Sequence, residues 1–245
     1  MEKIRLQKYF TMCGVLSRRA AEAEIAAGAV TVNGTPASIG DKIDPEADVV
    51  CWRGVPVENH TQNGHTYIML HKPAGYVTTM SDEGGRPCVA DLLQDIPIRI
   101  YPVGRLDMYS EGLLLCTDDG TLTNKLTHPS HSVPKKYMVK IKGTLTHQDI
   151  RRLTAPMRLD GYTLRPVRAK LCKSGIVDRG GVVYSTVQIT LFEGRNRQIR
   201  RMCDAVGLTI LRLRRTAIGN LSLGDLKAGS WRRLTEDEIH YLQNL

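Results

Sequence analysis

Residues 103–120 read VGRLDMYSEGLLLCTDDG, and they place Asp107 in a glycine-bearing loop immediately before an apolar strand. A side chain at the edge of a rigid element points in a defined direction, and catalytic groups commonly lie at such places. Most aspartates in loops cap helices or form turns, so the pattern alone only nominates Asp107 as a catalytic carboxylate. Arg105, two residues earlier, could hold this carboxylate in its charged form if the two side chains pair.

Around this loop, short strands are interspersed with few helices. Strands are predicted at 67–70, 113–117, 136–141, 165–171, 182–191 and 210–213, and helices at 122–126, 148–153, 198–206 and 236–242. Within 184–191 the apolar residues occupy every second position, which is typical of a half-buried strand. The absence of regular βαβ alternation predicts an α+β fold, with a mixed, mostly antiparallel sheet and flanking helices.

The N-terminal residues 1–52 predict a separate small domain of two helices and a hairpin. Apolar residues at helical spacing predict the first helix over Glu2–Met12. Ser17 is placed to N-cap the second helix, which stops at Gly28. Asn33-Gly34 then gives a strong turn signal between short alternating segments.

A linker and a larger domain follow this small unit. Residues 53–65 are polar and rich in Gly, Pro and Asn, which predicts a linker. The remaining residues 66–245 then form the domain that carries the chemistry.

The charge of the chain favours a polyanionic partner. The 34 Lys and Arg residues exceed the 25 Asp and Glu residues, which gives a net charge of +9. Phosphate neutralisation by cations supplies most non-specific affinity for nucleic acids, although a merely soluble basic protein has the same total. The cations cluster in two places. One cluster is Lys3, Arg5, Lys8, Arg18 and Arg19, and the other is the segment EGRNRQIRRMCDAVGLTILRLRR at 193–215.

Other chemistries find little support. The six cysteines show no CxxC spacing, so neither a zinc site nor a redox pair is predicted. The charged N-terminal sequence MEKIRLQKYF is unlike a secretory leader, and no apolar stretch is long enough to span a bilayer. We therefore expect a soluble, cytoplasmic protein with reduced thiols. The sequence contains no dinucleotide fingerprint, no phosphate-binding loop and no plausible metal cluster.

Tyr137 lies where a predicted strand begins, in the sequence Lys135-Lys136-Tyr137. Its ring could belong to the core, as most half-buried aromatics in strands do. It could instead stack on an extruded base, which enzymes that work on a base require. Only 5% of the residues are aromatic, so the chain has few rings suited to stacking.

Taken together, these segments resemble a known family. GRLDMYSEGLLLCTDDG, PKKYMVKIKG and FEGRNRQIRRM, in this order, are similar to the RsuA/RluB-type ribosomal RNA pseudouridine synthases, and HKPAGYVTTMSDEGGRPCVADLL at 71–93 resembles their first catalytic-domain segment. RLQKYFTMCGVLSRRAAEAEIAAGAVTVNG at 5–34 resembles the alpha-L RNA-binding domain of a small-subunit ribosomal protein. One departure is Ser110, where the family often has threonine.

The resemblance implies an isomerase that detaches a uracil from its ribose, rotates it and rejoins it through C5, without a cofactor. It implies that Asp107 is the essential carboxylate, that Tyr137 stacks on the target base, and that Arg200 pairs with Asp107. The implied RNA contacts are Arg5, Ser17, Arg18, Arg19, Arg105, Arg195, Arg197 and Arg201. The expected partner is ribosomal RNA or a subunit precursor, with large-subunit RNA favoured, and the chain is expected to be a monomer.

Two rival interpretations stand beside this one. A ribosome assembly factor could keep the fold and the RNA binding without the reaction, although binding alone has no evident need for a carboxylate near phosphates. Hydrolysis of the glycosidic bond would typically call for two working carboxylates, and the sequence nominates one.

Overall fold

The structure is a computed structural model, and it describes residues 3–58 and 64–245. The chain divides into two compact units. The first contains the described residues up to 67 together with 95–101 and 117–120, and the second contains 68–94, 102–116 and 121–245. No described helix combines the length and the apolar character needed to cross a membrane.

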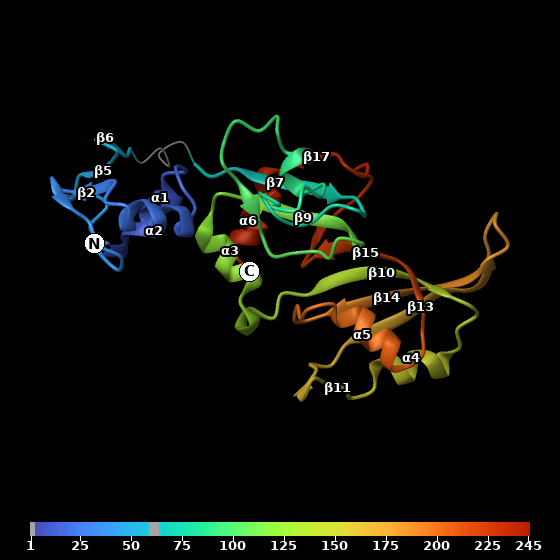
Figure 1. The fold of residues 1–245 in the computed structure, drawn as a ribbon. Helices are drawn as coiled ribbons and strands as arrows, with labels where there is room; N and C mark the ends of the chain where they lie inside the picture. The colour runs from blue at the N-terminus through green and yellow to red at the C-terminus, as the bar shows by residue number, and fades with distance from the viewer. Residues whose placement is uncertain (1–2, 59–63) are drawn as a thin grey trace. The chain divides into compact units, whose positions relative to one another are not determined.

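The first unit packs two helices against a small antiparallel sheet (Figure 1). Its helices are α1 (Leu6–Met12) and α2 (Arg18–Ala26), and its sheet has the order β3 (Thr35–Pro36), β2 (Val30–Val32), β5 (Val50–Trp52) and β6 (Val55–Pro56). Buried apolar side chains from both helices and from the sheet, including Phe10, Ile25 and Val50, form one core.

Two local signals in this unit are confirmed. The Ser17 side chain accepts a hydrogen bond from the Ala20 N–H and so caps α2. Asn33 and Gly34 both adopt positive φ, at 50° and 80°, as a tight hairpin turn requires.

The predicted start of the first helix is wrong. Ile4 and Arg5 form the short strand β1, which pairs with β4 (Lys42–Ile43), and α1 begins only at Leu6. The strand pairing satisfies backbone groups that a helical turn would otherwise bond, which explains the difference. Arg5 therefore lies at the N-cap of α1 and not on its side.

The predicted linker over 53–65 overlaps the first unit. β6 pairs with β5, and Val57 is buried in the core of this unit, so the sheet continues past residue 53. The alternation of apolar and polar residues is too short here to be read from sequence alone. Residues 59–63 lie outside the described part of the chain.

The second unit is built on one large sheet (Figure 1). Its main strands, in spatial order, are β13 (Arg168–Val177), β14 (Val183–Leu191), β10 (Lys135–Lys142), β15 (Ile210–Ile218), β9 (Glu111–Thr117), β7 (Tyr67–Lys72) and β17 (Trp231–Arg233). β10 is antiparallel to β14 and β15, whereas β15 is parallel to β9. The predicted α+β fold with a mixed, mostly antiparallel sheet is confirmed.

The remaining elements flank or extend this sheet. They are β8 (Tyr101–Pro102), β16 (Leu221–Ser222), the hairpin β11 (Arg158–Leu159) and β12 (Tyr162–Thr163), the 3-10 turns Val89–Leu92 and Pro129–His131, and the helices α3 (Gly120–Thr127), α4 (His147–Thr154), α5 (Gln198–Ala205) and α6 (Glu236–Gln243). All six main strands predicted for this region are present, and most are longer than the apolar pattern indicated.

Helices α4 and α5 cover one face of β13, β14 and β10, as Figure 1 shows. Ile199 and Met202 of α5 and Leu153 of α4 pack in one buried cluster with alternate residues of β10 and β14. Burial of a side chain of this size stabilises the fold by roughly 1.5–3 kcal/mol. Ile199, Met202 and Cys203, which recur at helical spacing, form the buried face of α5.

Gly112 allows a close approach between strands β9 and β15. It has φ +112°, and a Cβ placed there would lie 2.2 Å from the Arg215 carbonyl oxygen and 2.7 Å from the Arg215 nitrogen. Both obstacles are backbone atoms, so no side-chain rotation could relieve the clash. The two strands can run side by side only with glycine at this position.

We predict that Gly112→Ala lowers the free energy of unfolding by about 3 kcal/mol, because the new methyl group forces β9 and β15 apart. Gly161→Ala is the matched control, since Gly161 also has positive φ, +76°, but has nothing within 4 Å of the added Cβ. The control should cost only about 1 kcal/mol of backbone strain. Urea unfolding measures both, and equal losses would contradict the steric argument.

Candidate active site

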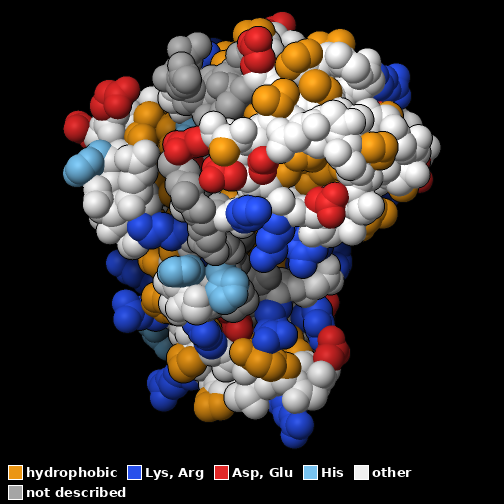
Figure 2. Space-filling view, turned by 90° about the vertical axis from the view of Figure 1, so that its left-hand side faces the viewer, with side chains coloured by type: hydrophobic (Ala, Val, Ile, Leu, Met, Phe, Trp, Pro, Cys, Tyr) orange, Lys and Arg blue, Asp and Glu red, His pale blue; other side chains and the backbone are white. Residues whose placement is uncertain are grey.

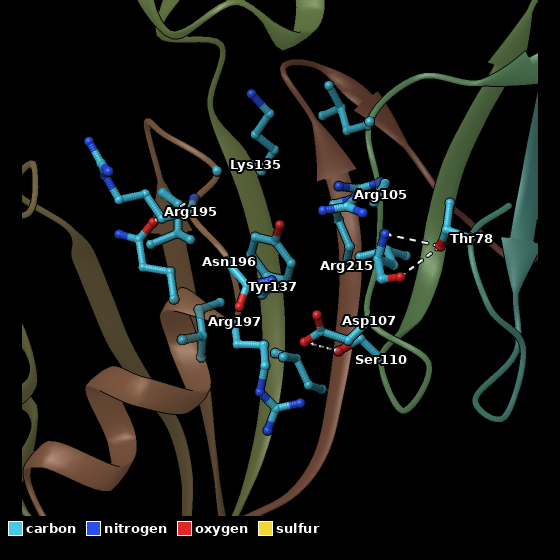
Figure 3. A pocket seen from close by; sticks show the side chains of 18 of the residues that line it. Thr78, Arg105, Asp107, Ser110, Lys135, Tyr137, Arg195, Asn196, Arg197 and Arg215 are labelled. Atoms are coloured by element: carbon cyan, nitrogen blue, oxygen red, sulfur yellow. Dashed lines mark hydrogen bonds between the residues drawn. The ribbon is translucent and has the colours of Figure 1, made fainter. Parts of the chain in front are cut away.

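A cavity of about 480 Å³ opens in the second unit, and Asp107 lies in its wall. The lining comes from five parts of the chain, namely 77–78, 103–110, 126–137, 191–199 and 213–218. Figure 3 shows Tyr137 and Arg215 on neighbouring strands, with Asp107 and Ser110 on the loop beside them. The sheet register thus gathers side chains that are far apart in the sequence.

The buried ammonium group of Lys72 anchors the Asp107 loop through its backbone carbonyl oxygens. Lys72 is 0% exposed. Its Nζ donates to the carbonyl oxygens of Asp107 at 3.1 Å, Met108 at 3.2 Å and Ser110 at 2.8 Å, and to that of its neighbour Pro73 at 3.0 Å. Hydrogen bonds from a charged donor are stronger than neutral ones, so this contact fixes the path of the loop.

Thr78 holds the same loop from a second direction. Its hydroxyl donates to the Leu106 carbonyl at 2.6 Å and accepts from the Leu106 N–H at 3.2 Å (Figure 3). The side chain is 8% exposed, so water competes little for these bonds. Asp107 therefore sits between two anchored neighbours.

Arg200 is the cation paired with Asp107. Its Nε lies 3.5 Å from Asp107 Oδ2, which is an ion-pair separation and longer than a good hydrogen bond. Its Nη2 donates to the Tyr109 carbonyl at 3.0 Å and to the Ser110 hydroxyl at 3.2 Å. Ser110 Oγ in turn lies 3.5 Å from Asp107 Oδ2. The arginine therefore contacts the loop and its carboxylate together.

Tyr137 and Arg215 are cross-strand partners on β10 and β15. Both line the cavity, so the Tyr137 ring belongs to its wall as well as to the edge of the adjacent core cluster. Tyr137 therefore packs against the core and also borders the cavity, so both interpretations of its role agree with its position. A half-buried ring beside a cavity is suited to stacking on a planar ligand.

Arginines surround the mouth of the cavity. Arg105, Arg195 and Arg197 line it and are exposed. Arg195 is partly committed, because its Nε lies 3.5 Å from Glu193 Oε2 and its guanidinium lies over the Tyr162 ring. The sequence suggested Arg105 as a partner of Asp107, but Arg105 lies at this rim and the ion pair of Asp107 is with Arg200. Exposed guanidinium groups here are suited to phosphates.

The other predicted RNA contacts lie outside this cavity. Arg201 pairs with Asp160 and lines a separate, smaller hollow with the β11–β12 hairpin. Arg18 and Arg19 are exposed at the start of α2 in the first unit, and Arg5 is exposed in β1. Ser17 is occupied as a helix cap through its side-chain oxygen.

Four cavity and loop residues were missed by sequence reasoning: Lys72, Thr78, Lys135 and Arg215. Lys72 and Thr78 lie in the segment HKPAGYVTT, where each has a polar neighbour, His71 and Thr79 respectively. Nothing local distinguishes them, because polar residues in such segments are usually solvated. Arg215 was visible only as one more cation of a basic segment.

Burial lowers the pKa of both lysines in this group, Lys72 and Lys135. Burial lowers the pKa of Lys72 to about 8, while the Asp107 and Glu111 carboxylates act in the opposite direction and Arg215 lowers it further. Burial, followed by the nearby charge of Arg215, lowers the pKa of Lys135 to about 8. Arg215 is thus close enough to both lysines to repel their charged forms.

The site can hold a planar group against Tyr137, with a carboxylate positioned at one side and cations around it. Comparison with known proteins supplies the class of enzyme. Residues 66–205 match the family model described as RNA pseudouridylate synthase. This span includes Asp107, Tyr137 and Arg200. The chain belongs to the RNA pseudouridylate synthase family.

Relatives that align with almost the full chain are also named as pseudouridine synthases. The ribosomal large subunit pseudouridine synthase B of Bacillus subtilis is 39% identical over 242 residues, covering 98% of this chain and 96% of the relative. The dual-specificity RNA pseudouridine synthase RluF of Escherichia coli is 37% identical over 236 residues, covering 96% and 77%. A solved pseudouridylate synthase, 30% identical, has a TM-score of 0.65 and covers 98% of this chain and 99% of its own. The RsuA/RluB-type resemblance is confirmed, and the protein is an RNA pseudouridine synthase, an isomerase.

We predict that Thr78→Val slows isomerisation about 10- to 100-fold, because a small displacement of a reacting group has effects of this size. Valine matches the shape of threonine but cannot bond Leu106. Thr78→Ser retains the hydroxyl and should keep a rate near that of the wild type. Single-turnover rates on RNA measure the effect, and equal rates for Val and Ser would contradict the loop-positioning role.

Lys72 should also give stability a specific pH dependence. Its pKa of about 8 in the folded protein lies below the ordinary lysine pKa of 10.5, so the unfolded chain binds more protons between these pH values. The contribution of this residue to the free energy of unfolding therefore rises as pH increases from 8 to 10.5. Urea unfolding at pH 7.5 and 9.5 should show a more positive slope for the wild type than for Lys72→Met. Lys135 is present in both proteins and cancels, so parallel slopes would contradict the shift.

Proposed function

We propose that this enzyme converts a specific uridine of ribosomal RNA to pseudouridine, with Asp107 as the essential carboxylate and without a cofactor. The observation that carries this proposal is the placement of Asp107 in the cavity wall, paired with Arg200 at 3.5 Å, in the same cavity as Tyr137. An isomerisation needs neither an oxidant nor an energy source, so side chains can supply all of its chemistry.

In this proposal Asp107 meets the positive charge that develops on the ribose. The carboxylate either adds to the anomeric carbon or stabilises charge while a glycal-type intermediate forms, and both routes need it beside the sugar. Arg200 orients the carboxylate through the contacts described above. Tyr137 stacks on the target base and can take part in proton transfer.

The exposed arginines at the mouth of the cavity would position the RNA. Arg105, Arg195 and Arg197 contact phosphates there, while Arg201 contributes from the neighbouring hollow. Phosphate contacts fix register and orientation, and the flipped base carries the specificity.

The first unit would serve as an RNA-binding domain, which comprises residues 1–52 and the strand β6 that extends its sheet, joined to a catalytic domain over 66–245. Arg18 and Arg19 at the N-terminus of α2 support this, because free N–H groups and the helix dipole also favour phosphate there. Arg5 and Ser17 complete the proposed set. Exposed Lys and Arg side chains are prominent on the face that Figure 2 draws.

Large-subunit ribosomal RNA is the favoured substrate, because the Bacillus subtilis relative that matches almost the entire chain is named for that subunit. We propose that the enzyme acts as a monomer in the cytoplasm, on free RNA or on a subunit precursor. The rival function is a ribosome assembly factor that binds the same RNA without reaction.

The test uses ribosomal RNA transcripts carrying tritium at uridine C5. That position loses its hydrogen only when a carbon–carbon bond forms there, so release reports isomerisation and not binding. The wild type should release tritium, and Asp107→Asn should lower the rate by on the order of 10³-fold or more while it keeps its affinity for RNA.

Asp225→Asn is the matched control, because Asp225 is an exposed carboxylate that does not line the cavity. It should release tritium at the wild-type rate. No release by the wild type from either subunit RNA, or from partly assembled particles, would favour the assembly factor instead.

A further inference from the structure

Arg215 is a buried cation whose guanidinium group is only partly satisfied. It is 5% exposed, although it lines the cavity. Its Nε donates to the Leu113 carbonyl at 2.8 Å, which anchors the group on strand β9. Its Nη2 is buried and has no hydrogen-bond partner. No described residue accepts a hydrogen bond from this Nη2, and the cavity that Arg215 lines is where a ligand can supply an acceptor.

The charges around Arg215 do not neutralise it. Within residues 3–58 and 64–245, no carboxylate forms an ion pair with Arg215, and the nearby Glu111 pairs with Arg212 at 2.6 Å. Lys72 and Lys135 are close enough that Arg215 disfavours their charged forms. A buried charge without a counter-charge is strongly unfavourable. The position of Arg215 beside a cavity indicates that an anionic group completes the site.

Lys135 belongs to the same cluster. It lines the cavity from β10, and its Nζ donates to the Leu126 carbonyl at 3.3 Å. The described part of the chain gives it no acidic partner either. Two cations without a counter-charge therefore face one small cavity.

The position of Arg215 points to the base and not to the RNA backbone. Arg215 pairs in register with Tyr137, the ring proposed to stack on the base, and Figure 3 shows the two side chains on adjacent strands. The exposed cations that could meet phosphates, Arg105 and Arg197, lie at the rim instead. A phosphate would have to lose most of its water to reach a side chain that is 5% exposed.

We propose that Arg215, assisted by Lys135, forms an anion subsite that binds the uracil base while it is detached from the ribose. This inference rests on the proposed function. When the N1–C1′ bond breaks, its electron pair stays with the base, and the uracil carries one negative charge over N1 and its carbonyl oxygens. A fixed guanidinium beside those oxygens stabilises the charge where it develops.

The reaction balances around this subsite. The ribose loses the electron pair. Asp107 then either bonds to C1′, in a bond that breaks when C5 attacks, or accepts the C2′ proton to leave a glycal and returns that proton when C5 bonds to C1′. After the base rotates, C5 bonds to C1′, the C5 hydrogen leaves as a proton, and N1 gains a proton. The charge on the base is then gone, so Arg215 binds the intermediate more tightly than the substrate or the product, which is what accelerates a reaction.

The test compares uridine with 5-fluorouridine at the target position. Fluorine withdraws electrons and makes the detached base a more stable anion, so it depends less on a protein cation. Single-turnover loss of the target nucleoside, measured after digestion of the RNA, reports both substrates. Arg215→Gln should slow the uridine reaction by about 10²-fold, comparable to removal of one donor from an oxyanion site, with a clearly smaller loss for 5-fluorouridine.

Two further variants keep the test decisive if Arg215→Gln folds poorly. Arg215→Lys retains a cation and should recover part of the rate. Lys135→Gln leaves the Leu113 contact intact and should show the same dependence on base acidity with a smaller loss. RNA affinity should be unchanged in all three.

Equal losses on both substrates would overturn the inference, because a structural role does not respond to the acidity of the base. Weaker RNA binding with a shallower salt dependence would assign Arg215 to a phosphate and overturn it as well. An inactive wild-type enzyme would instead refute the proposed function, so the two failures are distinguishable.

Discussion

The contact between the Lys72 ammonium and the carbonyl oxygens of Asp107, Met108 and Ser110 is the constraint on which the site depends. A fully buried lysine must find acceptors for its protons, and these three carbonyls are available only while the loop keeps its present path. The Arg200 guanidinium then meets the same loop at the Tyr109 carbonyl and at Ser110. The direction of the Asp107 carboxylate is therefore set by backbone contacts, before any substrate arrives.

The cations of the second unit are graded by depth. Arg105 and Arg197 are exposed at the rim, Arg200 is 16% exposed beside Asp107, and Arg215 is buried. Each depth suits a different ligand, because a solvated arginine exchanges water for phosphate at little cost, whereas a buried one is effective only against a charge that enters the cavity. The excess of cations behind the net charge of +9 thus includes exposed arginines suited to phosphates and a buried arginine suited to a charge inside the cavity.

Much of the fold was predictable because its signals are local. Alternation in 184–191 identifies β14, the apolar run after Asp107 identifies β9, and the spacing of Ile199, Met202 and Cys203 gives the buried side of α5. Two predicted boundaries differ from the structure because of pairing between strands. The first helix starts later than predicted because Ile4 and Arg5 pair with β4, and the first unit extends into the predicted linker because β6 pairs with β5.

The sequence by itself determined the α+β class, the basic character, the family of the enzyme and the nomination of Asp107, Tyr137 and Arg200, since each of these follows from local pattern or from motifs. The tertiary structure shows the Arg200–Asp107 pair that the resemblance implied. Only the tertiary structure decided that Lys72 and Thr78 anchor the Asp107 loop and that Arg215 is buried beside Tyr137. The physical reason is that these contacts depend on strand register and on the close approach of β9 to β15 at Gly112. Local propensity does not encode such long-range distances, whereas packing of the folded chain does.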